Sequence, residues 1–248
     1  MTWTRTVIDE LRAFVRASLV EPVPRDHTET DAAFWRRRVV AVVTLVAGTG
    51  VLAWALRIEP GDDTFYVATL TLAAIWAVGA FASGPLHLGR AHTRDGGPPA
   101  RPWVQSLALG FMLLALFLAG ATVVAQVPVL REPVQELLDH ARFGSFAVVA
   151  VVTALNGISE ELYFRGALHA AVGRRHAVLV TTLVYTAVTA ASGIALLVLA
   201  GALLGLVTGL QRRVTGGILG PTITHLVWSL GMLALLPPWL DFLARTLD

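Results

Sequence analysis

Long apolar blocks separated by short polar connections dominate the chain. The blocks cover residues 39–58, 65–86, 104–125, 143–155, 177–191, 194–210 and 218–236. Most of them approach the roughly 20 residues that a helix needs to cross a bilayer. The pattern predicts an all-α, polytopic membrane bundle with seven transmembrane helices, and it leaves room for an eighth.

Three of these blocks are shorter than a membrane span. Block 143–155 is expected to continue as a helix to about Ala171, where Gly173 and two arginines follow. The dipeptide at 192–193 is Ser-Gly, which predicts a tight turn between the two neighbouring short blocks. Polar residues of the extended helix therefore lie at membrane depth.

Composition agrees with a membrane protein. Hydrophobic residues make up 55% of the 248 residues, charged residues only 15%, and the mean hydropathy is +0.67. The chain has no cysteine, which excludes disulfides, thiolate metal sites and a cysteine nucleophile.

Arginine provides all the basic charge, and its clusters fall on alternate connections. The clusters lie within 5–38, 90–101, 174–175 and 212–213, whereas 57–63 and 131–142 mix arginine with acids. The positive-inside rule then predicts a multi-pass protein of the cell membrane with a cytoplasmic N-terminus. Because this topology accounts for the pI near 9.6, we expect no nucleic-acid partner.

Three regions follow from this pattern. Residues 1–35 form a polar, amphipathic segment whose apolar residues recur at helical spacing, which predicts a helix on the cytoplasmic membrane surface. Residues 36–130 form N-terminal transmembrane helices. Residues 131–248 form a core that carries the chemistry, and the bilayer is the expected partner of the whole.

Two adjacent carboxylates and an arginine stand in the membrane-depth segment "GISEELYFRGALH" at 157–169. Unpaired charges are expensive there. Glu161 and Arg165 are four residues apart in the favourable order, so we assign them to a structural ion pair. Glu160 has Phe164 at the same spacing, and this lack of a partner favours a functional role.

Three polar residues on different helices share one depth. Glu160, Thr189 and His225 each lie twelve to fourteen residues from the basic turn at one end of their helix, or about 18–21 Å at 1.5 Å per residue. Convergence at one level predicts a shared site.

The segment "EELYFRG" at 160–166 resembles the EExxxR motif of the CPBP intramembrane proteases. This family includes the type II CAAX prenyl endopeptidases and bacterial proteins grouped as abortive-infection proteins. The later segment "GPTITHLVWSLG" is similar to the family's last motif, a histidine followed four residues later by Asn or Asp. The resemblance covers about residues 140–237 and implies a glutamate-dependent intramembrane endopeptidase.

The resemblance also implies roles for individual residues. Glu160 takes the place of the glutamate that activates water, alone or in a metal site, and His225 that of the assisting histidine. Thr189 and Ser229 stand where the family has a histidine and an amide, and their hydroxyls can bond a water or a carbonyl oxygen. Glu160 and His225 are the candidate ligands of a divalent metal such as zinc, one short of the usual three.

Two functions of different classes remain open. The first is a peptidase that cuts a peptide or membrane-protein substrate near the cytoplasmic face. The second is a catalytically degenerate scaffold or regulator that binds another membrane protein. A transporter comes third, because intramembrane charges also mark permeation paths, but the sequence shows no inverted repeat.

Overall fold

A computed structural model of the chain describes residues 2–59, 62–94, 96–127 and 145–247. These residues are largely helical, with a single β-bridge between Ala91 and Ala100 in one connection. The order of elements is α1 (Thr2–Val15), η1 (Arg16–Val20), α2 (Asp31–Ala55), α3 (Thr64–Ser83), α4 (Trp103–Val124), α6 (Phe146–Glu160), η2 (Glu161–Leu168), α7 (His169–Val172), α8 (Ala177–Thr189), η3 (Ala190–Ser192), α9 (Ala195–Thr215) and α10 (Leu219–Leu247).

The predicted membrane bundle is confirmed. Six helices of the described chain are long and apolar enough to cross a membrane: α2, α3, α4, the continuous helix Phe146–Val172, α9 and α10. The seventh predicted block forms a shorter apolar helix, Ala177–Ser192. No eighth apolar helix of ten or more residues occurs among the described residues, and positions 143–144 of the fourth block lie outside them.

Local signals set several helix ends as the sequence predicts. The fourth block runs on to Val172, one residue beyond the expected end. Gly193 follows η3 with φ +70°, the left-handed conformation that favours glycine, and so makes the predicted turn. One end differs: α10 continues to Leu247 through Pro237 and Pro238 instead of stopping near 236. Neighbouring helices can satisfy the backbone groups that proline frees in a membrane helix.

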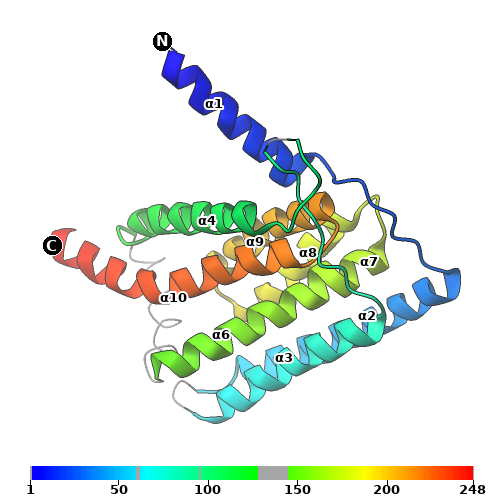
Figure 1. Cartoon of the computed structure of the whole chain (residues 1–248). Helices are drawn as coiled ribbons and strands as arrows, with labels where there is room; N and C mark the ends of the chain where they lie inside the picture. The colour runs from blue at the N-terminus through cyan, green and yellow to red at the C-terminus, as the bar shows by residue number, and fades with distance from the viewer. Residues whose placement is uncertain (1, 60–61, 95, 128–144, 248) are drawn as a thin grey trace.

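The helices pack as neighbouring pairs around one central helix (Figure 1). The pairs are α2 with α3, α4 with α10, and α8 with α9. Helix α6 and its continuation η2 contact both α3 and α10, which places the EExxxR segment inside the bundle.

The outer and inner surfaces of the bundle have opposite patterns. Large apolar side chains such as Val46, Val78 and Phe81 point outward and are more than 60% exposed, as expected for a surface that lipid covers. Small residues line the helix contacts: a Cβ on Gly48 would lie 2.3 Å from the Trp76 ring. This close approach fixes α2 against α3.

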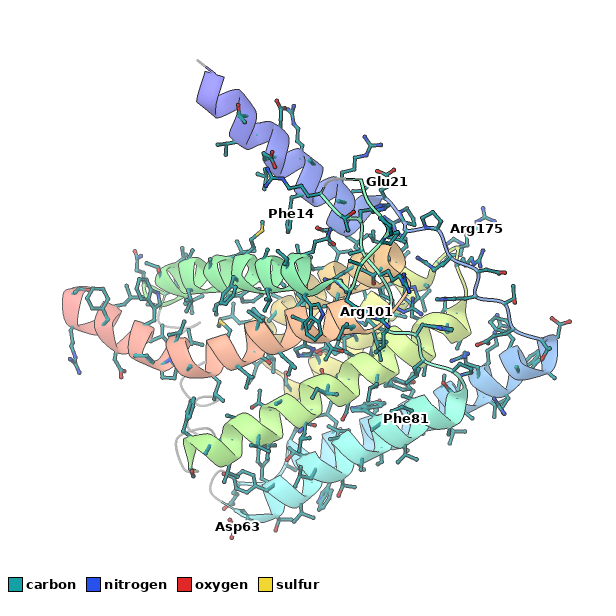
Figure 2. All side chains as sticks on the ribbon, in the orientation of Figure 1. Phe14, Glu21, Asp63, Phe81, Arg101 and Arg175 are labelled. Atoms are coloured by element: carbon teal, nitrogen blue, oxygen red, sulfur yellow. The ribbon has the colours of Figure 1, made fainter. Side chains whose placement is uncertain are left out.

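The described part of the acid-containing connection 57–63 lies at the opposite end of the bundle from the basic connections. In Figure 2, Asp63 lies at the lower left of the bundle and Arg175 on the opposite side, at the upper right. Contacts also bring Arg213 to the N-terminal segment, where it donates to the Leu19 carbonyl. The arginine clusters that the sequence assigned to one side therefore share one end of the fold.

The N-terminal segment begins with the predicted helix. Helix α1 projects away from the bundle (Figure 1), and its apolar residues Val7, Ile8 and Leu11 are exposed. An exposed apolar face is what a helix on a membrane surface presents. Its location at a membrane stays a prediction.

Candidate active site

The EExxxR motif lies on a widened stretch of helix. Residues Glu161–Leu168 form a π-helix that continues α6 without a break, and such stretches are frequent at functional sites. Tyr163 anchors this stretch: its ring stacks on Trp76 at 4.5 Å, and its hydroxyl donates to the Ala41 carbonyl at 2.6 Å. The motif is thus pinned to both α2 and α3.

Glu161 is the centre of a buried charge cluster formed by Glu161, Arg165 and His225. Its Oε2 lies 3.3 Å from Nε of Arg165, and its Oε1 lies 2.9 Å from Nδ1 of His225. Glu161 and Arg165 are both 0% exposed. One carboxylate therefore contacts a cation and an imidazole, which offsets the cost of burying it.

Arg165 is held by charge and aromatic contacts. Its guanidinium carbon lies 4.6 Å from the ring centroid of Tyr185, a cation–π contact. None of its three side-chain nitrogens has a hydrogen bond among the described residues. The Arg165 carbonyl accepts from Nε of Arg212 at 2.7 Å, which ties the motif to α9.

Glu160 lies in a different environment, although it is the adjacent residue. It is half-buried, and its Oε2 accepts a hydrogen bond from the Tyr185 hydroxyl at 2.6 Å. No arginine or histidine of the described chain lies within 4.0 Å of its carboxylate. Of the two carboxylates of the motif, Glu160 is therefore the one without a cationic partner among the described residues.

Sequence reasoning did not include Tyr185 among the site residues. Tyr185 lies four residues before Thr189, where the CPBP family's second motif has a phenylalanine followed four residues later by a histidine, so the signal was the extra hydroxyl at an aromatic position. Sequence reasoning also missed the bond between Glu161 and His225, because spacing along one helix says nothing about a partner on α10.

Thr189 and Ser229 have unequal surroundings. The Thr189 hydroxyl donates to the carbonyl of Tyr185 at 2.9 Å. A Cβ on Gly201 would lie 2.9 Å from the hydroxyl oxygen of Thr189. The Ser229 hydroxyl is buried and has no hydrogen-bond partner among the described residues. Ser229 therefore keeps a free hydroxyl, whereas that of Thr189 is engaged by its own helix.

The donors present do not fit a tightly held catalytic metal. Among the described residues no group of three or more His, Cys, Asp and Glu side chains is placed to hold an ion. The two proposed ligands keep one donor atom each, Nε2 of His225 and Oε1 of Glu160, because Nδ1 of His225 contacts Glu161 and Oε2 of Glu160 accepts from Tyr185. A catalytic zinc normally has three protein ligands.

Fold and site together define a polytopic helical membrane protein with a carboxylate site inside the bundle. The model of the family described as "Type II CAAX prenyl endopeptidase Rce1-like" matches residues 142–231, which hold the whole site. The predicted CPBP-type assignment is confirmed on this segment. Neither the curated proteins nor the solved structures gave a match.

Proposed function

We propose that the chain is an intramembrane endopeptidase that cuts a peptide or membrane-protein substrate near the cytoplasmic face. One observation carries the proposal. The Glu160 carboxylate is half-buried at membrane depth with a neutral tyrosine hydroxyl as its bonded partner, while the adjacent Glu161 holds the cation. A carboxylate that no cation neutralises is suited to take a proton from water.

The two oxygens of Glu160 have separate tasks in this reaction. Tyr185 holds Oε2, which leaves Oε1 for a water molecule. Oε1 takes a proton as the water oxygen bonds to the carbonyl carbon of the substrate. The peptide C–N bond then breaks, and the proton passes to the leaving nitrogen, so the products are a carboxylic acid and an amine, which ionise to a carboxylate and an ammonium group.

His225 assists from α10. An ionised carboxylate only accepts hydrogen bonds, so the ring donates from Nδ1 to Glu161 and its Nε2 is left for substrate or water. The edge of the ring packs against Gly157, on the same helix as Glu160: a Cβ there would lie 3.6 Å from Nε2. The free Ser229 hydroxyl, one turn further along α10, can donate to the carbonyl oxygen that becomes negative.

The test compares purified protein with Glu160→Gln on a library of membrane-protein and peptide substrates. Glu160→Gln should remove cleavage, and Glu59→Gln, at an exposed glutamate, should leave it unchanged. Because the donor set does not fit a held metal, a chelator should leave the rate unchanged. Cleavage by Glu160→Gln at the parental rate contradicts the proposal.

A scaffold that binds another membrane protein is the second candidate, and one observation favours it. The Thr189 hydroxyl, at the position of a family histidine, bonds its own helix backbone and so offers little to a substrate. The scaffold predicts no cleavage by either protein, together with a crosslinked membrane partner that Glu160→Gln retains.

A further inference from the structure

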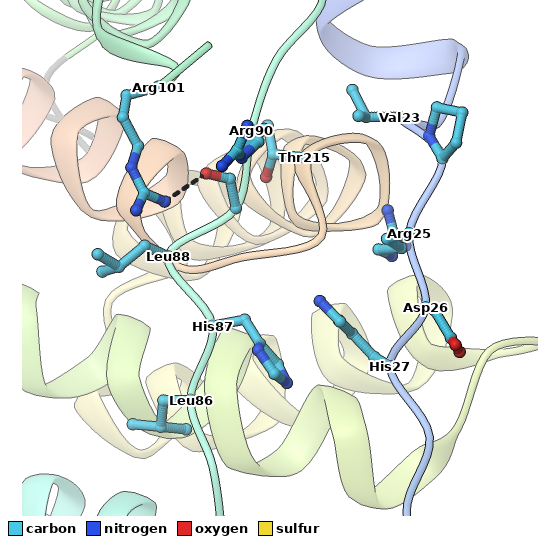
Figure 3. Close-up of a pocket in the computed structure, with 12 residues that line it drawn as sticks. Val23, Arg25, Asp26, His27, Leu86, His87, Leu88, Arg90, Arg101 and Thr215 are labelled. Atoms are coloured by element: carbon cyan, nitrogen blue, oxygen red, sulfur yellow. Dashed lines mark hydrogen bonds between the residues drawn. The ribbon is translucent and has the colours of Figure 1, made fainter. Parts of the chain in front are cut away.

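An open cavity of about 460 Å³ lies at the arginine-rich end of the bundle (Figure 3). Three segments far apart in sequence enclose it: the N-terminal segment 23–27, the connection 86–90 with Arg101, and Thr215 at the end of α9. The cavity shares no residue with the carboxylate site. An inference about it therefore stands apart from the proposed peptidase.

Backbone hydrogen bonds tie the three segments together. The Val23 amide donates to the Val214 carbonyl at 2.9 Å, and the Arg90 amide donates to the Thr215 carbonyl at 2.9 Å. Gly89, with φ +83°, allows the connection 86–90 to contact the backbone that follows α9. A Cβ on Gly89 would lie 2.7 Å from the backbone nitrogen of Gly217. The cavity wall is thus fixed before any ligand arrives.

Three arginines line the cavity without an acidic partner. Arg25, Arg90 and Arg101 have no carboxylate within 4.0 Å among the described residues. Their guanidinium groups bond only backbone carbonyls of the described chain; Arg101, for example, donates to the Gly89 carbonyl at 2.9 Å. In Figure 3 the one acidic lining residue, Asp26, points away from the cavity.

Other arginines at the same end have acidic partners. Four pairs lie within 4.0 Å: Arg12 with Asp9, Arg16 with Glu21, Arg37 with Glu29 and Arg94 with Glu10. The positive-inside rule explains why arginine is abundant at one end of a membrane protein. It does not explain why three of these residues surround one cavity and bond only backbone carbonyls among the described residues.

Two histidines complete the cavity. The rings of His27 and His87 stack with centroids 3.6 Å apart and an angle of 13° between their planes. Burial and then the neighbouring positive charges lower the pKa of both side chains. Even with neutral imidazoles, the cavity holds an excess of positive charge that an anion would balance.

We propose that this cavity binds a phosphate group, carried either by an anionic lipid headgroup or by a soluble phosphate. Guanidinium groups recognise phosphate oxygens in pairs of parallel hydrogen bonds, and three of them line this cavity. The volume is that of a small-molecule site. Leu86 and Leu88 line the cavity beside the arginines, which suits the glycerol or acyl portion next to a headgroup phosphate.

The test measures binding to the full-length protein by two routes. Inorganic phosphate is titrated calorimetrically into protein in detergent. Retained lipid is counted by native mass spectrometry after transfer from nanodiscs of phosphatidylcholine with or without phosphatidylglycerol. The double variant Arg90→Gln/Arg101→Gln should weaken one-site binding at least about tenfold. The control Arg94→Gln/Arg175→Gln removes the same charge outside the cavity and should change it less than about threefold.

The two routes also distinguish the source of the phosphate. Saturation by inorganic phosphate identifies a soluble ligand, whereas one retained phosphatidylglycerol without such saturation identifies a lipid headgroup. The single substitution Arg101→Glu, which places an acid in the cavity, should cause the same loss of binding. No saturable binding by either route, or equal weakening in the cavity and control variants, overturns the proposal.

Discussion

The buried charge cluster and the cavity at the arginine-rich end differ in whether their arginines have acidic partners. Arg165 is fully buried and lies against both a carboxylate and an aromatic ring. Arg90 and Arg101 are exposed and meet no carboxylate among the described residues. At membrane depth an unpaired ion is expensive, whereas water and salt screen it at the end of the bundle. Charges in the first region are therefore structural, and those in the second stay available to a ligand.

The same comparison applies within the EExxxR motif. Glu161 is neutralised and 0% exposed, whereas Glu160 is half-buried and hydrogen-bonded to an uncharged group. Glu160, whose negative charge has no cationic partner among the described residues, is the residue to which we assign the catalytic role. Four predictions test these two comparisons.

The largest effect is expected from Glu161→Gln. It leaves Arg165 buried without a counter-charge and weakens the contact to His225, at a cost of about 3–5 kcal/mol in the free energy of unfolding. Thermal unfolding in detergent measures it, with Glu160→Gln as the matched control. Adding Arg165→Met to Glu161→Gln should recover part of the loss; equal losses in the two single glutamine variants would contradict the division.

The next effect is expected from Thr189→His, which restores the residue type of the family motif. Thr189 already packs tightly against Gly201, so the larger ring should destabilise the protein by about 2 kcal/mol. It should add no bound zinc, because the side chain points into a helix contact. Thermal unfolding and metal content after dialysis are measured, with Thr189→Ala as control. A gain in zinc affinity would show that the inner region has room for a further ligand.

A smaller effect is expected from Tyr185→Phe, which removes only the hydroxyl on Glu160. This hydrogen bond fixes the direction of the carboxylate and leaves Oε1 for water, so without it kcat should fall about tenfold with KM unchanged. Kinetics on a cleaved substrate measure it. Because the ring that faces Arg165 is retained, stability should fall less than in Glu161→Gln. A change confined to KM would assign Tyr185 to substrate binding instead.

The smallest effect concerns pH at the cavity. Burial first, and then His87, Arg212, Arg25 and Arg174, lower the pKa of His27 in the folded state. In the unfolded state His27 binds a proton more readily than in the folded state. The stability that neutral His27 contributes is therefore fully present above about pH 6.5, and it is lost as pH falls toward the folded pKa.

Unfolding temperatures at pH 7.5 and 5.5 measure this effect. The drop between them should be smaller in His27→Gln than in the parent, and inorganic phosphate should reduce the parental drop if it binds beside the ring. An equal drop in both proteins would show that protonation of His27 is not the cause of the lower unfolding temperature at pH 5.5.

Much of the architecture could be predicted from the sequence. The apolar blocks predicted the spanning helices, Gly193 marked its turn, and the charges of the fourth helix were placed at membrane depth. These features are local, because hydrophobic length and glycine conformation act within one segment. The π-helical form of Glu161–Leu168 was not predicted, since its hydrogen-bond pattern depends on contacts with α3, α9 and α10.

The sequence by itself determined which residues are polar at membrane depth, and the i,i+4 spacing of Glu161 and Arg165. Only the tertiary structure decided that His225 contacts Glu161, that Tyr185 contacts Glu160, and that segments around positions 25, 90 and 215 enclose one cavity. The physical reason is rotation: spacing fixes the depth of a residue in its helix, but helix packing fixes the direction in which its side chain points.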